Sequence, residues 1–158
     1  MMIHSFYRTD INLDLYQYQE VPQAIVPYEQ RFERSLSTAI KKFQAELNWK
    51  EMWNLQDVKL RLISGWKFWV LRPKNQIRGW IWLTPTGEMK NLYVSKRLRN
   101  QGWGKQLYLT AMNEALDLGY SSVFTRVDVW NEPAKACVDN LLQFVGCKSN
   151  IKLTTEDY

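Results

Sequence analysis

The sequence predicts a single domain over residues 1–158, a mixed α/β layer structure whose mostly antiparallel sheet is flanked by about four helices. The length fits one domain of roughly 100–150 residues. Short aromatic and β-branched runs, separated by turn residues, fill the middle of the chain. Helix-like and strand-like segments alternate in the last third. Hydrophobic residues make up 46% and charged residues 23%, which excludes a disordered chain.

The first predicted element is an amphipathic helix within residues 27–47. Its apolar residues recur at spacings of three and four, which places them on one helical face. They are Tyr28, Phe32, Leu36, Ile40, Phe43 and Leu47.

The stretch over residues 49–64 has two interpretations. Gln56 and Asp57 interrupt the apolar face of a continuous helix, so we expect a shorter helix over residues 49–55. Residues 58–62 then alternate between apolar and charged side chains, so a strand is the alternative interpretation of that part.

A meander of three strands follows. The strands are predicted at residues 67–72, 77–84 and 88–95, and turns rich in Pro, Asn and Gly separate them at residues 73–76 and 85–87.

The last third predicts helix, strand, helix and strand in turn. A helix over residues 104–118 ends at a glycine, and a strand over residues 122–130 follows it. A second helix over residues 133–145 begins with proline and also ends at a glycine. A last short strand is expected over residues 151–154.

Composition excludes several classes of function. The one histidine, His4, lies near a terminus expected to be mobile, which excludes histidine triads and His-rich zinc sites. Cys137 and Cys147 are expected to be reduced, buried residues.

The chain shows no run of roughly 18 apolar residues and no secretion signal, so a cytoplasmic protein is expected. A net charge of +5 favours an anionic partner.

Residues 92–105 carry the motif with the clearest chemistry: a strand, a basic loop with glycines and the start of a helix. At such a junction the unpaired N–H groups of the first helical turn and the helix dipole favour a bound phosphate. Gly102 and Gly104 let the backbone approach a ligand. Basic side chains of this segment supply charge that compensates a pyrophosphate. They are Lys96, Arg97, Arg99 and Lys105.

This arrangement resembles the GNAT superfamily of N-acetyltransferases, whose motif A is Arg/Gln-x-x-Gly-x-Gly/Ala. Arg99, Gly102 and Gly104 occupy its three defined positions. Residues 92–94 match the strand end from which family members hydrogen-bond pantetheine, and Asn131 begins an Asn-x-x-Ala pattern similar to the family's. The resemblance implies a GNAT fold with a central, mostly antiparallel mixed sheet that splays at a cofactor cleft.

The resemblance covers residues 65–146 and implies acetyl-CoA as cosubstrate. The implied acceptor is an amine of a small molecule or protein that attacks the thioester directly, and a backbone N–H at Leu92 or Tyr93 is expected to polarise the thioester oxygen. No metal or membrane is implied, and a homodimer fits the resemblance because dimers are frequent in the family. The residues implied to bind the cofactor are Leu92, Tyr93, Val94, Arg99, Asn100, Gln101, Gly102, Trp103, Gly104, Lys105 and Asn131.

Glu88 is the implied catalytic base. An alkyl amine has a pKa near about 10.4 and must lose a proton before it attacks, so a carboxylate is expected nearby. Glu88 has the position of the base in some histone-modifying relatives, and strand alternation places it on the same face as Lys90, Leu92 and Val94. An exposed turn residue is the alternative for Glu88, and Asp128, solvent-facing or paired with an arginine, is the weaker candidate.

The family's usual general acid is missing. Relatives commonly protonate the CoA thiolate with a Tyr on the helix after the Asn, but the matching positions here are Val138 and Leu142. Cys137 lies beside the first position and is expected to pack in the core. Water can replace the acid, because a thiolate with a pKa near about 8.5 is a tolerable leaving group. The missing Tyr favours the alternative function, a catalytically inactive GNAT-fold protein that binds CoA or serves as an interaction module.

The chain has eight tryptophans, most of which core packing explains. Trp49, Trp53 and Trp66 lie where the family builds its acceptor site, so an aromatic or apolar acceptor pocket is the other interpretation. Aromatic residues among basic ones also occur in single-strand nucleic-acid binders. The sequence lacks the fingerprint of such a module, so nucleic acid is not the expected partner.

Overall fold

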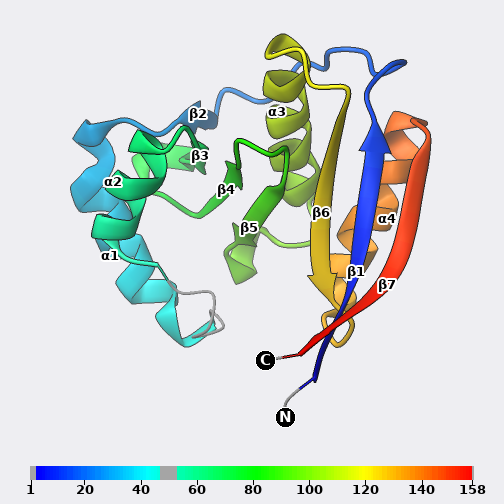
Figure 1. Ribbon diagram of the computed structural model, residues 1–158. Coiled ribbons are helices and arrows are strands. Elements are labelled where there is room, and N and C mark those ends of the chain that lie inside the picture. The colour runs from blue at the N-terminus through cyan, green and yellow to red at the C-terminus, as the bar shows by residue number, and fades with distance from the viewer. Residues whose placement is uncertain (1–2, 47–52, 158) are drawn as a thin grey trace.

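The computed structural model describes residues 3–46 and 53–157 and arranges them as two antiparallel sheets with helices packed against them (Figure 1). One sheet has four strands in the order β2-β3-β4-β5, and the other has three in the order β6-β1-β7. The strands are β1 (Ile3–Asn12), β2 (Ile25–Pro27), β3 (Lys67–Leu71), β4 (Gly79–Leu83), β5 (Met89–Val94), β6 (Ser122–Asp128) and β7 (Ser149–Asp157).

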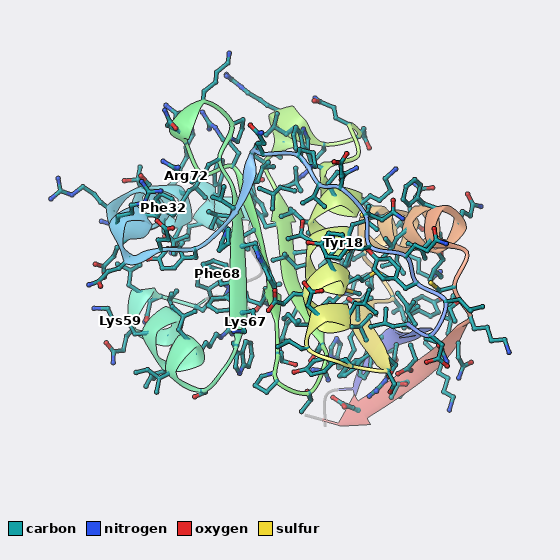
Figure 2. The ribbon with its side chains drawn as sticks, turned by 90° about the horizontal axis from the view of Figure 1, so that it is seen from above. Tyr18, Phe32, Lys59, Lys67, Phe68 and Arg72 are labelled. Atoms are coloured by element: carbon teal, nitrogen blue, oxygen red, sulfur yellow. The ribbon has the colours of Figure 1, made fainter. Side chains whose placement is uncertain are left out.

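Helices cover both faces of the four-stranded sheet. On one face α1 and α2 bury an aromatic cluster, in which Phe32 and Phe68 are labelled in Figure 2. On the opposite face α3 packs its Leu107 and Met112 against Ile81, and α4 adds residues to the same cluster from the side of the three-stranded sheet. The helices are α1 (Glu33–Phe43), α2 (Leu55–Ile63), α3 (Trp103–Asp117) and α4 (Glu132–Val145).

The two sheets meet between the edge strands β5 and β6, which run parallel to each other. One bridge joins them, between Glu88 and Phe124, and the Phe124 N–H donates to the Gly87 carbonyl at 3.0 Å. The Thr125 hydroxyl donates to the Met89 carbonyl at 3.0 Å just beyond the bridge. Past these contacts the two strands separate towards their C-terminal ends (Figure 1). The predicted sheet that splays between two neighbouring strands is therefore confirmed.

The meander and the alternation after it are also confirmed. Strands β3, β4 and β5 lie within the three predicted ranges, and α3, β6 and α4 lie within a residue or two of theirs. The first helix is shorter than predicted, because single 3-10 turns replace its two ends at Gln30–Phe32 and Gln44–Glu46. Leu47 lies outside the described residues.

The predicted strand over residues 58–62 is wrong, because α2 covers that stretch. The Asn54 side chain accepts from the Asp57 N–H at 3.0 Å, and the Asp57 carboxylate accepts from the Asn54 N–H at 2.8 Å. This capping box starts the helix, so Asp57 is a helix-start residue and no interruption of an apolar face. The predicted helix over residues 49–55 falls largely outside the described residues, and Leu55 is the first residue of α2.

The segment that contains His4 was expected to be a mobile chain end, but it forms the strand β1. β1 is the middle strand of its sheet and pairs antiparallel with both β6 and β7. From His4 to Asn12 the buried residues are Phe6, Thr9 and Ile11, a spacing without the clear alternation from which a strand is predicted. The short β2 was not predicted either, since its three residues are too few to show a period.

Within the described residues, no helix is long and apolar enough to cross a membrane. Over the same ranges, no group of three or more His, Cys, Asp or Glu side chains could hold a metal ion.

We predict that Ile11→Ala lowers the free energy of unfolding by about 2–5 kcal/mol, because it leaves a cavity in the middle strand. Ile11 is fully buried, whereas Leu15, a few residues on, is 80% exposed and provides the control Leu15→Ala. Urea denaturation of both variants measures the difference. Equal midpoints for the two variants would contradict the placement of β1 in the core.

Candidate functional site

A cleft of about 380 Å³ opens where β5 and β6 separate. Strands β1 and β7 line one side, α2 lines the other, and the start of α4 and one side chain of α3 complete the wall. Its polar and charged lining residues are His4, Arg61, Glu88, Lys90, Asn91, Tyr108, Thr125, Arg126, Asp128, Asn131 and Glu156.

Glu88 lies at the closed end of the cleft and is 7% exposed, so the alternative of an exposed turn residue is wrong. Arg126 of β6 donates to both carboxylate oxygens, from Nε at 2.8 Å and from Nη2 at 3.0 Å. The hydrogen bonds from this side chain to Glu88 raise the pKa of Arg126. The pair joins β5 to β6 just where they begin to separate.

A β-bulge in β5 changes which residues face the cleft. Trp82 of β4 pairs with Lys90, but Trp80 pairs with Tyr93, so β5 has one more residue between these pairs than β4. Asn91 takes a positive φ of 58° there. The predicted shared face is therefore wrong. Lys90 stays on the α2 side with Glu88, while Leu92 and Val94 pack on the α3 side.

The start of α3 has the form predicted for a phosphate site. Gly102 is the N-cap, with a φ of +86°. No neighbouring heavy atom lies within 4 Å of the position that a Cβ would take there. The Gly102 carbonyl accepts the first hydrogen bond of the helix, from the Gln106 N–H at 3.1 Å. The N–H groups of residues 103–105 therefore have no acceptor within the helix. Trp103, at the first position of the helix, is half-buried against the core.

Arg99 is bound within the protein. Its Nε donates to the Val94 carbonyl at 2.8 Å, and Nη2 donates to Glu46 Oε2 at 3.0 Å. The Tyr93 hydroxyl donates to the same oxygen at 2.8 Å. Arg99 therefore fixes the loop to the end of β5, and the charge predicted to face a phosphate is directed at Glu46.

The rest of the basic loop faces outward. Asn100 turns the chain with a φ of 62°, and the Gln101 side chain donates to the Arg97 carbonyl at 3.0 Å. Lys105 lies 4.1 Å from the centre of the Phe144 ring. Lys96 and Arg97 have no ion pair within the described residues, so they can supply the predicted charge.

Gly104 is needed for packing between helices. A Cβ at this position would lie 2.8 Å from Cys137 Sγ on α4. Burial raises the pKa of the Cys137 thiol to about 11, so this residue stays a neutral thiol in the core. The expectation that Cys137 serves as packing is confirmed.

Asn131 caps α4. Its Oδ1 accepts from the Ala134 N–H at 3.2 Å, which explains the Asn-x-x-Ala pattern as a helix start. Asn131 also lines the cleft, so its predicted contact with a cofactor and its capping role are compatible.

Tyr108 lines the cleft from α3 and was missed by the sequence analysis. It is 3% exposed and lies near Thr125 and Cys137. Burial raises the pKa of Tyr108, so its hydroxyl keeps its proton at neutral pH. The i, i+4 spacing from Gly104 to Tyr108 places both on the side of α3 that meets α4, and this spacing could have identified the residue.

Asp128 is not paired with an arginine as one alternative expected. Its carboxylate accepts from His4 Nε2 across the end of β1, and both residues line the cleft. Trp53 is buried in the aromatic cluster and Trp66 packs against that cluster, so both serve chiefly as core, whereas Trp49 lies outside the described residues.

Two antiparallel sheets that separate beside the N-terminus of a helix define a mixed α/β protein with a polar cleft between the sheets. A model of the GNAT acetyltransferase family matches residues 35–142, and the chain belongs to this family. No curated protein matches the chain.

Solved structures share this fold. A protein from Drosophila is 11% identical over 98% of this chain and 50% of its own, with a TM-score of 0.69. A GNAT-family protein from Novosphingobium aromaticivorans is 10% identical over 98% of this chain and 63% of its own, with a TM-score of 0.70. This chain thus spans about half to two thirds of those proteins. An aminoglycoside acetyltransferase from a soil metagenome is 18% identical over 74% of this chain and 85% of its own, with a TM-score of 0.60.

We predict that Gly104→Ala destabilises the protein by about 1–3 kcal/mol, because the added methyl group collides with Cys137 Sγ. In a Cys137→Ala background the collision is absent, and the same substitution is expected to cost nothing, since Ala favours a helix over Gly. A double-mutant cycle in urea measures the coupling. Additive effects would contradict a contact between these two residues.

Proposed function

We propose that this protein is an acetyl-CoA-dependent N-acetyltransferase that transfers the acetyl group to a primary amine by direct attack. The observation that carries the proposal is the cleft between β5 and β6, which is lined by the bulged strand β5 and by a buried tyrosine. The uncapped start of α3 follows β5 in the chain and lies outside the lining of this cleft. Membership of the GNAT family supports acyl transfer.

Acetyl-CoA would be held by backbone groups at two places. The N–H groups of residues 103–105 and the open side of Gly102 suit the pyrophosphate, with Lys96 and Arg97 as nearby charges. The end of β5, residues 92–94, suits the pantetheine arm, because among the described residues only β4 pairs with this part of β5 and the edge that faces β6 has no strand partner past the bridge. Asn131 contacts the same arm from the start of α4.

The reaction needs a proton acceptor and a proton donor. The neutral amine attacks the thioester carbon, a C–N bond forms, and the C–S bond breaks. Glu88 takes the proton of the amine through a water molecule, since each carboxylate oxygen that binds Arg126 has a second lone pair. Tyr108 gives its proton to the departing thiolate, and a backbone N–H at the bulge polarises the carbonyl oxygen.

The role proposed for Tyr108 weakens the case for the alternative function, a catalytically inactive GNAT-fold protein. That alternative rested on the missing Tyr of α4, where Val138 is fully buried. A tyrosine from α3 beside Cys137 supplies the same chemistry from the neighbouring helix. The ion pair of Arg99 with Glu46 reduces the free positive charge of the loop, which weakens the case for nucleic acid.

We predict that Gly102→Glu abolishes acetyl-CoA binding, because it adds bulk and negative charge at the start of α3. Gly119→Glu is the matched control: it lies after the other end of α3, has a similar φ of +82°, and is equally open. Isothermal titration calorimetry of both variants with acetyl-CoA measures the effect. Full affinity in a folded Gly102→Glu variant would place the pyrophosphate elsewhere.

We predict that Glu88→Gln and Tyr108→Phe each lower kcat by roughly 10²-fold at pH 7 while acetyl-CoA still binds. The loss in Glu88→Gln should shrink as pH rises, since more of the amine is then already neutral. Tyr16→Phe is the control, because Tyr16 is buried and donates to Asn113 at 2.7 Å on the far side of α3. A wild-type rate in either variant removes that residue from the mechanism.

A further inference from the structure

Arg61 enters the cleft from α2 in an unusual setting. Its guanidinium centre lies 4.5 Å from the ring centre of Trp66, 5.1 Å from Trp82 and 5.8 Å from Trp53. Its Nη1 donates to Asn91 Oδ1 in the β5 bulge at 2.9 Å. The aromatic rings and the bulge therefore hold a cation at one place on the cleft wall.

Arg61 has no carboxylate partner within the described residues. Among the described residues, its hydrogen bond to Asn91 uses one of the five N–H donors of the guanidinium. Burial lowers the pKa of Arg61, and the charge of Asp57 opposes this effect only in part. Lys90, from the same side of the sheet, lies 5.9 Å from the Trp66 ring and also has no ion pair in the described chain. Two cations on one wall thus lack an anion.

The facing wall of the cleft carries two carboxylates, together with Arg126, whose guanidinium is bound to Glu88. Asp128 of β6 lies there with His4, and Glu156 of β7 lies opposite His4 in the strand pairing. Glu88 lies at the closed end with Arg126. A molecule in this cleft meets unpaired cations on the side of α2 and carboxylates on the side of the three-stranded sheet.

We propose that the acceptor carries a carboxylate beside its amine, as a free amino acid does, and that Arg61 and Lys90 bind this carboxylate. A guanidinium binds a carboxylate through two parallel N–H donors, and Arg61 has donors free for this. The ammonium group then faces the carboxylates of Asp128 and Glu156 and the closed end, where Glu88 can take its proton. The inference rests on the proposed acetyl transfer, in which the acceptor gains an acetyl group on nitrogen and its carboxylate is unchanged.

Matched pairs of acceptors test the proposal. Each pair is an amino acid and the amine that lacks its carboxylate: phenylalanine with phenethylamine, leucine with isoamylamine, and lysine with cadaverine. CoA release from acetyl-CoA gives kcat/KM for each compound. We expect the amino acid to be preferred in at least one pair, by roughly tenfold or more, since a charge-assisted hydrogen bond is lost in its partner.

Variants then assign the preference to the cationic wall. Arg61→Gln is expected to reduce the ratio of the two kcat/KM values by roughly 10- to 100-fold. Lys59→Gln, on the outer side of the same helix and bound to Glu33 at 3.4 Å, is expected to keep the ratio (Figure 2). Lys90→Gln is the second test and keeps the proposal falsifiable should Arg61→Gln fail to fold.

The outcomes separate the two proposals. Acetylation of the simple amines as fast as, or faster than, the amino acids overturns this inference and leaves acetyl transfer standing. An unchanged ratio in both cleft variants overturns the assignment to Arg61 and Lys90. Acetylation of neither class by a protein that binds acetyl-CoA contradicts the proposed function, and this inference falls with it.

Discussion

The separation of β5 from β6 is the constraint on which the rest of the molecule depends. Neighbouring parallel strands normally continue their hydrogen bonds, and unpaired backbone groups in a protein interior are costly. Among the described residues, the backbone hydrogen bonds between β5 and β6 stop at the bridge between Glu88 and Phe124, and one side-chain bond from Thr125 follows it. The backbone groups beyond it need a partner other than a strand, and an extended, amide-containing ligand can provide one. The cleft is thus a consequence of an incomplete sheet.

Two charge clusters keep the separated strands in place. Glu88 and Arg126 join the closed end by two hydrogen bonds, and removal of either partner would leave a largely buried charge. Arg99 joins the open end of β5 to Glu46, at the end of α1. The first pair is largely buried, whereas Arg99 of the second is exposed, and an exposed ion pair contributes little to stability. The first pair fits a role in fixing the closed end of the cleft, and the second fits a role in fixing the loop after β5.

The sequence predicts the parts whose signals are local. Turn residues and alternation define the meander, and glycines mark the start of α3, where we propose that the pyrophosphate binds. The parts it misses depend on distant partners. β1 is recognisable as a strand only through its pairing with β6 and β7, and the bulge at Asn91 appears only when β5 is aligned with β4. In the sequence Arg61 is one charged residue among others on a helix. Its contacts with the Trp66 and Trp82 rings come from other segments and are visible only in the fold.

Tyr108 illustrates how one helix can combine two tasks. The first turn of α3 has N–H groups without a helical acceptor, which we propose bind the pyrophosphate, and the next turn places a tyrosine at the cleft. The second task depends on the first motif, because Gly104 lets α4 approach and Cys137 packs where a Cβ would stand. A larger residue at Gly104 would push α4 away from Tyr108 and reduce the burial of that tyrosine. The glycine at the start of α3 therefore also sets the environment of the tyrosine that we propose as the general acid.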